Sequence, residues 1–427
     1  MADDKDREAS DLLVPDPVLG VPLPAYGGRS LPNVTRSVVD AVGATLVGAG
    51  ALAPPLAPPL DPFAGRRAEG PIVVLLVDAL GWPAFARWAS GRASAGDARW
   101  RDGARPITSI FSTTTTAALV SLSTGAPPGR TGVVGYRQYL PAFGLVADLL
   151  RSTPLAVGIP ESLVGPTWTP GLVSGVPNVF ARGLPAVALS RASFQGSGFT
   201  RLLYEGAEFV GYATATDLAH LLTEVLRRPT PPPAVFAYWD ELDTIQHLRG
   251  PQQALIDLEL DQVARALRHV ARAVSGAGRS GPTLLLTADH GQVPADRASL
   301  IALDQEPELL ALLARPPAGD RRAGFFEPRP GQTEALREAL RRRLPPGSRV
   351  LDTAQAAERG LFGPPPFHPE LHERLGGLIA LVPSPAGLGY TPPGRPAPVR
   401  HLAGAHGGLE PAELLVPLFS APLASLA

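Results

Sequence analysis

Apolar runs alternate with helical stretches along the chain from residue 71 onward. Four of these runs are continuous rather than alternating, which is typical of strands that are buried on both faces of a sheet. They span residues 72–77, 156–159, 235–239 and 283–287. Strands of this kind separated by helices predict an α/β fold, with a mostly parallel central sheet and helices on both faces. Ligands of such sheets bind beyond the carboxyl ends of the strands, so the residues that follow each run are the candidates for function.

This rhythm breaks between residues 296 and 372, where we predict a small α+β insert. The segment contains one Arg-rich helix candidate and two short strand candidates, at 334–343, 325–326 and 350–351. Two later apolar runs are expected to rejoin the main sheet, at 378–382 and 414–418. The main domain is therefore assigned to residues 71–295 and 373–427.

Residues 1–70 are interpreted as an N-terminal extension and connector. Their sequence is polar at first and then rich in Pro and Gly, and the Pro-rich stretch at 53–62 is typical of an extended linker. One helix is expected over 33–52, with Asn33 or Thr35 as its cap.

Composition and charge narrow the classes of function. The 427 residues are 45% hydrophobic and 18% charged, which is enough for a large buried core. With 38 basic and 39 acidic residues, the net charge of -1 creates no field that would recruit nucleic acid or an anionic membrane. No apolar run reaches the roughly 18 residues that span a bilayer. We therefore expect a cytoplasmic protein with no membrane and no nucleic acid polymer as partner.

The chain contains no cysteine, which excludes disulfides, thiolate metal sites and cysteine nucleophiles. Any metal ligands must therefore be His, Asp or Glu. Asp78 is the first candidate, because it follows the apolar run 72–77 directly and precedes Gly81, which leaves room for a turn. The alternative role for Asp78 is the cap of the next helix.

Four threonines at positions 113–116 precede an Ala-rich helical stretch that ends near Gly125. A hydroxyl at the start of a helix faces free backbone N–H groups and the positive end of the dipole, where a phosphate binds. A nearby metal ion would lower the pKa of that hydroxyl and make it a nucleophile. The alternative is a capped loop without catalytic function.

Asp243 and His247 follow the run 235–239 and are four residues apart. On a helical turn they share one face and can bind one ion, although a surface ion pair is the ordinary role of such a pair. Asp240 and Glu241 are alternative ligands.

Asp289 and His290 follow the run 283–287, and Gly291 permits the bend that would let both side chains reach one ion. His406 lies between glycines just before the last apolar run, which is typical of a ligand on a loop. Together these clusters suit two sites of oxygen and nitrogen ligands, of the kind that bind zinc or manganese.

The order of these motifs resembles the alkaline phosphatase superfamily, most closely its type I phosphodiesterase and nucleotide pyrophosphatase branch, over residues 71–427. His247 begins a His-x-x-Gly-Pro motif of that branch, which ends here at Pro251. The nucleophile of the superfamily lies ten residues before the glycine of a Thr-Gly pair, which here gives Thr115 from Gly125. Thr114 and Thr116 are close enough in sequence to remain alternatives.

The resemblance implies two divalent metal ions, zinc or manganese, and a phosphothreonine intermediate that water hydrolyses. One ion would be bound by Asp78, Asp289, His290 and the oxygen of Thr115. The other would be bound by Asp243, His247, His406 and the same oxygen. The implied activity is the hydrolysis of phosphate esters, with a small-molecule ester or a nucleotide as substrate.

The sequence departs from the branch where a phosphate-binding Asn is usual after a His-Gly. Here Tyr136 and Arg137 follow a Gly, and they are the candidates for substrate binding. Three alternatives stay open: a phosphomonoesterase that uses Arg137 or Arg321 for the extra charge, a phosphonate hydrolase, and a non-catalytic metal-bound scaffold. The insert at 296–372 is expected to cap the site and to select the substrate.

Overall fold

The computed structural model describes residues 2–48, 50, 52–92, 97–275, 281–396 and 402–427. Its larger sheet has seven strands in the order β2-β18-β9-β1-β8-β6-β7. Their bounds are β1 Ile72–Val77, β2 Ala104–Thr108, β6 Ala186–Arg191, β7 Glu208–Tyr212, β8 Ala234–Trp239, β9 Thr283–Thr287 and β18 Leu415–Pro422. Strands β9, β1, β8, β6 and β7 are parallel, whereas β18 runs antiparallel between β9 and β2. The predicted mostly parallel sheet is confirmed.

The register of the three central strands sets the position of the candidate site. All six residues of β1 are buried, as are those of β8, because both faces of the sheet are covered. Val77 pairs with Trp239 of β8, and Leu76 pairs with Thr287 of β9. The carboxyl ends of these strands therefore lie at one level of the sheet edge. The polar residues that follow them are brought together there.

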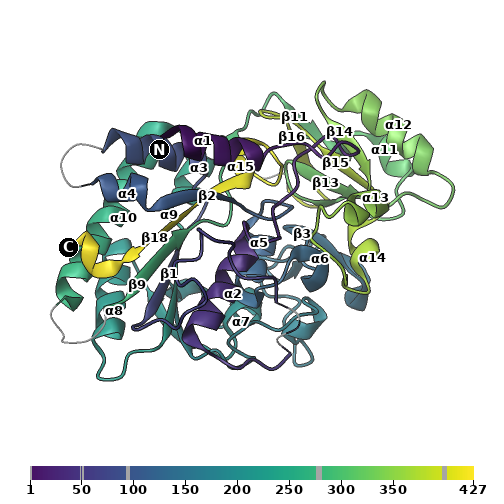
Figure 1. Ribbon diagram of the computed structural model, residues 1–427. Coiled ribbons are helices and arrows are strands. Elements are labelled where there is room, and N and C mark those ends of the chain that lie inside the picture. Colours follow the sequence, from purple (N-terminus) through teal and green to yellow (C-terminus); the bar gives the residue numbers. More distant parts are fainter. Residues whose placement is uncertain (1, 49, 51, 93–96, 276–280, 397–401) are drawn as a thin grey trace.

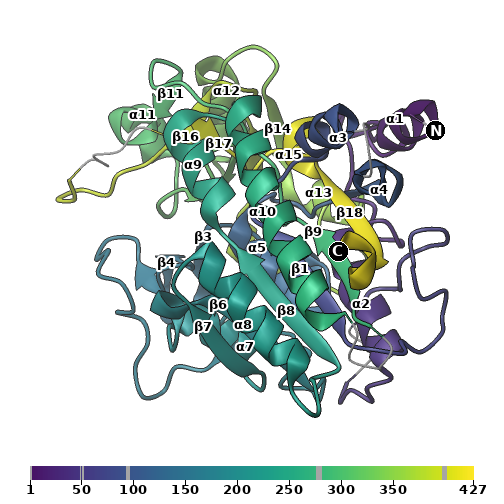
Figure 2. The same cartoon turned by 90° about the vertical axis from the view of Figure 1, so that its left-hand side faces the viewer.

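Helices cover both faces of this sheet. Figure 1 shows α8 and α10 on one side of the sheet and α2 and α5 on the other, and Figure 2 shows α10 lying along its face. The α-helices are α1 Ala2–Asp11, α2 Leu31–Val42, α3 Trp82–Gly91, α4 Ala98–Asp102, α5 Thr115–Thr124, α6 Pro128–Thr131, α7 Gly198–Tyr204, α8 Ala215–Arg227, α9 Glu241–Arg249, α10 Gln253–Val274, α11 Pro307–Ala311, α12 Thr333–Arg343, α13 Thr353–Glu358, α14 Leu371–Leu375 and α15 Pro411–Leu414. Within the described ranges, every helix is too short or too polar to cross a membrane.

A second seven-stranded sheet lies beside the first, on the right of Figure 1, in the order β14-β15-β13-β12-β3-β4-β5. Its strands are β3 Arg137–Leu140, β4 Leu145–Asp148, β5 Thr153–Pro154, β12 Ala318–Gly319, β13 Ala323–Phe326, β14 Arg349–Asp352 and β15 Leu378–Leu381. Two small sheets pair β10 Val293–Pro294 with β17 Gly404–Ala405, and β11 Leu300–Ala302 with β16 Gly387–Gly389. The second sheet thus combines strands from two parts of the chain: β12, β13 and β14 belong to the segment 296–372, whereas β3, β4, β5 and β15 lie outside it.

Three expectations about local structure were wrong. The run at 156–159 is a turn, because Val157 and Ile159 are 43% and 64% exposed and no strand pairs with them among the described residues. The run at 378–382 forms β15 of the second sheet, where it pairs with β13 and β14 instead of rejoining the main sheet. The helix expected over 33–52 spans Leu31–Val42, because Gly43 adopts a left-handed φ of 78° that ends it.

Candidate metal centre

Asp78 lies at the carboxyl end of β1, where its backbone N–H donates to the carbonyl of Trp239 at 2.8 Å. This bond extends the pairing with β8 by one residue, so the carboxylate projects beyond the sheet at a fixed level. The residue is only 2% exposed. Tyr238 donates its hydroxyl to Oδ2 of Asp78, which leaves Oδ1 buried and without a hydrogen-bond partner. An ionised oxygen in that position requires a cation.

Asp289 and His290 follow β9 and are both completely buried. Oδ1 of Asp289 accepts from the backbone N–H of Ala79 at 3.1 Å and from that of His290 at 2.9 Å. Its Oδ2 is buried and has no hydrogen-bond partner, and it lies 3.4 Å from Nε2 of His290. Asp78, Asp289 and His290 form one group whose ligand atoms lie within 4.8 Å of one another.

Gly291 permits a close approach of three backbone segments, which its sequence position did not predict. Its φ is not in the left-handed range, but a Cβ at this position would lie 1.9 Å from the carbonyl oxygen of Ala412 and 2.6 Å from Cα of Gly81. The chain after Asp289 therefore packs directly against two other backbone segments. This close approach brings β9, the turn after β1 and α15 together.

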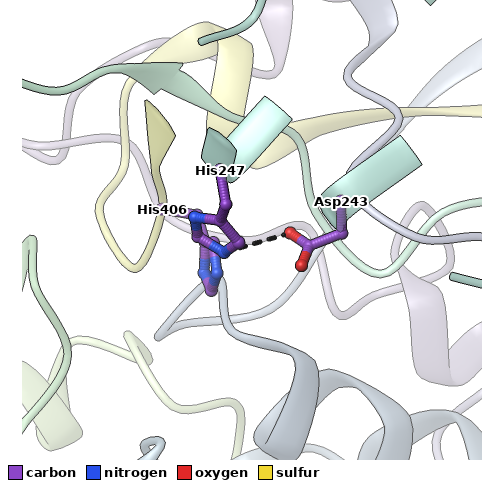
Figure 3. A group of neighbouring side chains, drawn as sticks. All are labelled: Asp243, His247 and His406. Atoms are coloured by element: carbon purple, nitrogen blue, oxygen red, sulfur yellow. Dashed lines mark ion pairs between the residues drawn. The ribbon is translucent and has the colours of Figure 1, made fainter. Parts of the chain in front are cut away.

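A second group of ligand atoms within 4.8 Å of one another consists of Asp243, His247 and His406 (Figure 3). Asp243 and His247 lie one turn apart on α9, and Oδ1 of Asp243 is 3.3 Å from Nε2 of His247. His406 comes from the loop between β17 and α15. Its ring centroid lies 5.1 Å from that of His247 and 3.9 Å from that of His290. The two groups are therefore adjacent.

The three candidate histidines share one arrangement of hydrogen bonds. Nδ1 of His247 lies 2.9 Å from the carbonyl of Gly404, and Nδ1 of His290 lies 3.1 Å from that of Gly291. Nδ1 of His406 lies 3.0 Å from the carbonyl of Thr113. A carbonyl only accepts, so Nδ1 carries a proton in each ring, and in the neutral form of the ring Nε2 has the lone pair. This is the tautomer that a metal-binding histidine uses.

Thr115 begins α5, and its hydroxyl lies 3.1 Å from Nε2 of His290. The flanking hydroxyls point elsewhere: Thr114 donates to Asp320 at 3.0 Å, and Thr116 donates to the carbonyl of Gly135 at 3.0 Å. Of these three threonines, Thr115 is the one whose hydroxyl contacts a candidate metal ligand.

The electrostatics of the centre suit a bound cation. Burial, together with the nearby carboxylates of Asp289 and Asp243, raises the pKa of Asp78 well above its usual range. Burial also raises the pKa of Asp243. Burial and the two neighbouring imidazoles lower the pKa of His406 well below its usual value. Crowded carboxylates and neutral imidazoles are the donor set of a divalent metal site, and a cation would offset the repulsion among them.

The remaining predicted site residues contact other parts of the protein. Arg137 donates to the carbonyl of Tyr390 at 2.9 Å, and the side chain of Tyr136 lies beside Asp148 of the second sheet. No described contact joins either side chain to the two ligand groups.

The alternative ligands Asp240 and Glu241 form ion pairs instead. Arg191 binds the carboxylate of Asp240 at 2.7 Å and that of Glu241 at 2.8 Å.

Two residues that support the ligands were missed in the sequence. Tyr238 orients Asp78, and Gln292 donates its amide to Oδ1 of Asp243 at 2.5 Å. A Tyr near the end of an otherwise apolar strand is a weak signal of such a role. Gln292 follows the Asp-His-Gly motif directly, but no spacing in the sequence links it to Asp243.

The chain matches the family described as type I phosphodiesterase / nucleotide pyrophosphatase over residues 72–407. No match was found among curated protein sequences.

Three solved structures share the fold. Murine ectonucleotide pyrophosphatase / phosphodiesterase 5 has a TM-score of 0.59 and 15% identity, covering 82% of this chain and 87% of that chain. Its inactive threonine-to-alanine variant in complex with AMP has a TM-score of 0.58 and 15% identity, with 82% and 88% covered. Phosphonoacetate hydrolase from Sinorhizobium meliloti 1021, in complex with phosphonoacetate, has a TM-score of 0.57 and 17% identity, with 84% and 92% covered.

Proposed function

The chain belongs to the type I phosphodiesterase / nucleotide pyrophosphatase family, and we propose that it hydrolyses phosphate diesters or nucleotides with two divalent metal ions and Thr115 as nucleophile. The observation that carries this proposal is the position of the Thr115 hydroxyl, 3.1 Å from Nε2 of His290 and at the start of α5. The inactive threonine-to-alanine variant of the murine structure supports a threonine in this role.

Two groups of ligands would hold the ions: Asp78, Asp289 and His290 would hold one, and Asp243, His247 and His406 the other. The Thr115 hydroxyl, which contacts His290, would serve as a further ligand. When bound, the two ions would lower the pKa of the hydroxyl and stabilise negative charge on the phosphate oxygens. Zinc and manganese both suit ligands of imidazole and carboxylate.

The residues of the chain perform the remaining steps. The Thr115 oxygen attacks phosphorus and loses its proton as the bond from phosphorus to the leaving oxygen breaks. The leaving oxygen takes up a proton and departs as the alcohol, and a phosphothreonine remains. Free backbone N–H groups at the start of α5 face the phosphoryl oxygens. Water then attacks phosphorus and the bond from phosphorus to the Thr115 oxygen breaks. The hydroxyl of the water stays on the released phosphate product, and its other proton passes to the Thr115 oxygen.

Substrate preference is tested with the purified protein loaded with zinc or manganese. We expect a bis-aryl phosphate diester to be hydrolysed faster than the matching monoester, with turnover lost in Thr115→Ala. Faster turnover of the monoester would move the protein to the phosphatases. Turnover of phosphonoacetate alone would favour a phosphonate hydrolase, the activity named for the fold neighbour from Sinorhizobium meliloti. Two bound ions without turnover of any of these compounds would favour the scaffold.

We further propose that the segment 296–372 contributes to substrate selection. Deleting it would remove β12, β13 and β14 and expose the edges of β3 and β15, so a point substitution is the better test. Arg321 is the candidate, because it is half-buried in the turn between β12 and β13, next to Asp320, which contacts the Thr115 loop. Arg321→Ala should change the relative rates for diester and monoester, whereas Arg341→Ala, at a distant position of the same segment, is the control and should not. If Arg321→Ala also keeps the wild-type ranking, Arg321 has no role in selection.

A further inference from the structure

Asp320 connects the second sheet to the loop that precedes Thr115. It lies in the turn between β12 and β13, and its Oδ1 accepts from the hydroxyl of Thr114 at 3.0 Å. Its Oδ2 lies 2.9 Å from the hydroxyl of Ser112 and accepts from the backbone N–H of Tyr136 at 3.3 Å. One carboxylate therefore contacts the loop that precedes α5 and also the segment that follows α6.

The turn that carries Asp320 is itself fixed against α15 and the residues that precede it. Two residues further on, Arg322 is only 1% exposed, and its guanidinium binds Glu413 at 3.1 Å and also Glu410. Glu413 is completely buried and accepts from the backbone N–H of Gly408 at 2.9 Å. The ion pairs thus tie the turn to the segment that carries His406.

The His406 loop packs tightly against the same turn. A Cβ on Gly407 would lie 2.6 Å from Cβ of Asp320, so the two backbones approach more closely than any other residue would permit. Thr113 bridges the remaining gap, because its hydroxyl donates to the carbonyl of Gly408 at 2.8 Å and accepts from the N–H of Gly407 at 3.1 Å. The loop before Thr115, the His406 loop and the β12–β13 turn therefore form one packed unit.

We propose that Asp320 is a positioning residue, which fixes the loop of Ser112–Thr114 and thereby sets the direction of the Thr115 hydroxyl. This inference rests on the proposed role of Thr115 as nucleophile. Asp320 acts through its three hydrogen-bonded partners and does not itself contact the reacting atoms. A displacement of about 1 Å in a reacting group can cost about 100-fold in rate, so loss of these bonds should lower kcat far more than it changes KM.

The test compares Asp320→Ala, Asp320→Asn, Thr114→Val and the double variant Asp320→Ala with Thr114→Val. Asp352→Asn is the matched control, because it changes a carboxylate at the end of β14, an edge strand of the same sheet, where it accepts from Gln355 N–H. Thr114→Val is a clean partner, because the Thr114 side chain makes no capping bond to α5. Bound metal, kcat and KM for the diester, and hydrogen exchange over residues 112–118 are measured for each protein.

We expect Asp320→Ala to keep its metal, to lose about 100-fold in kcat with KM within about twofold, and to exchange faster over residues 112–118. Asn retains one accepting oxygen and an amide that can donate to Thr114, so Asp320→Asn should recover part of kcat. The double variant should lose less than the product of the single effects, because the two residues share the hydrogen bond between Thr114 and Asp320. The control should match the wild type.

The proposal is overturned if Asp320→Ala keeps wild-type kcat and exchange, or if the single effects multiply in the double variant. If Asp320→Ala does not fold, Asp320→Asn and Thr114→Val decide by the same measurements, and wild-type values in both would refute the proposal. If the wild type hydrolyses no substrate, the proposed function fails, and the exchange measurement still decides whether Asp320 orders the loop.

Discussion

The imidazole rings of His290 and His406 stack with their centroids 3.9 Å apart and their planes 18° from parallel. His290 belongs to one group of candidate ligands and His406 to the other, so this contact joins the two groups. Burial and the neighbouring imidazoles hold the pKa of His406 well below its usual value, so its ring is neutral near pH 7. A neutral imidazole whose Nδ1 donates to a carbonyl has Nε2 free to bind a metal ion.

Removing metal ions should destabilise the protein. Oδ1 of Asp78 and Oδ2 of Asp289 are buried without hydrogen-bond partners, and the free energy of unfolding should rise when a cation binds them. At a free-ion concentration 1,000 times Kd, each site contributes about 4 kcal/mol. Thermal unfolding with a chelator, and then with added zinc or manganese, measures this effect. Asp289→Asn removes one of these buried charges. Without metal, the variant should therefore unfold at a higher temperature than the wild type, but adding the ion should raise its unfolding temperature only slightly.

Thr115 and Thr116 should differ sharply in their effect on turnover. Thr115→Ala should lower kcat by about 10³-fold or more, whereas Thr115→Ser should keep measurable activity because it retains the hydroxyl. Thr116→Val loses only a bond to the carbonyl of Gly135 and should stay within a few fold of wild type. Steady-state kinetics on the diester measures all three. Equal losses in Thr115→Ala and Thr116→Val would refute the choice of Thr115.

Tyr238→Phe should weaken metal binding. The variant loses the hydroxyl that donates to Oδ2 of Asp78, and loss of such a partner typically costs about 10–100-fold in metal affinity. Competition with a chelating dye measures the affinity. Tyr212→Phe is the control, because it removes another hydroxyl of the same sheet, one that donates to the carbonyl of Tyr238 at 2.7 Å. Identical affinities in the two variants would show that the Tyr238 hydroxyl does not orient Asp78.

Gly291→Ala should be strongly destabilising. The new Cβ would lie 1.9 Å from the carbonyl oxygen of Ala412, so the backbone would have to move. A clash of this kind in a packed interior costs about 1–3 kcal/mol and occasionally more. Urea unfolding gives the change in the free energy of unfolding. Gly27→Ala serves as control, because a Cβ there meets nothing within 4 Å.

The ion pair between Asp16 and Arg359 should make stability depend on pH in acid. The Arg359 guanidinium, followed by the N–H of Leu19, lowers the pKa of Asp16 from 3.8 to about 2. Because the folded state binds the proton more weakly than the unfolded state, the pair stabilises the fold above pH 4, and this contribution is lost as the pH falls toward 2. Asp16→Asn should therefore unfold at a lower temperature than wild type at pH 7, and the difference should shrink between pH 4 and pH 2. A constant difference over this range would show that the charge of Asp16 is not responsible.

The sequence by itself determined the class of fold and the family. Buried parallel strands are continuous apolar runs, and the polar residues that end them are visible as local patterns, so β1, β8 and β9 and the motifs that follow them could be found one segment at a time. The family match depends on the order and spacing of these same motifs. Both kinds of information lie within short stretches of chain.

Only the tertiary structure decided which atoms meet. The second sheet pairs β3 with β12, although β6, β7, β8 and β9 of the main sheet come between them in the sequence. No local pattern encodes such a pairing. The same holds for Asp320, whose neighbours in sequence give no sign that it contacts the loop before Thr115. The sequence also did not show where Tyr136 and Arg137 point. In the folded chain, Tyr136 lies beside Asp148, and Arg137 donates to the carbonyl of Tyr390. Hydrogen bonds and close packing between distant segments depend on distances that arise only when the chain is folded.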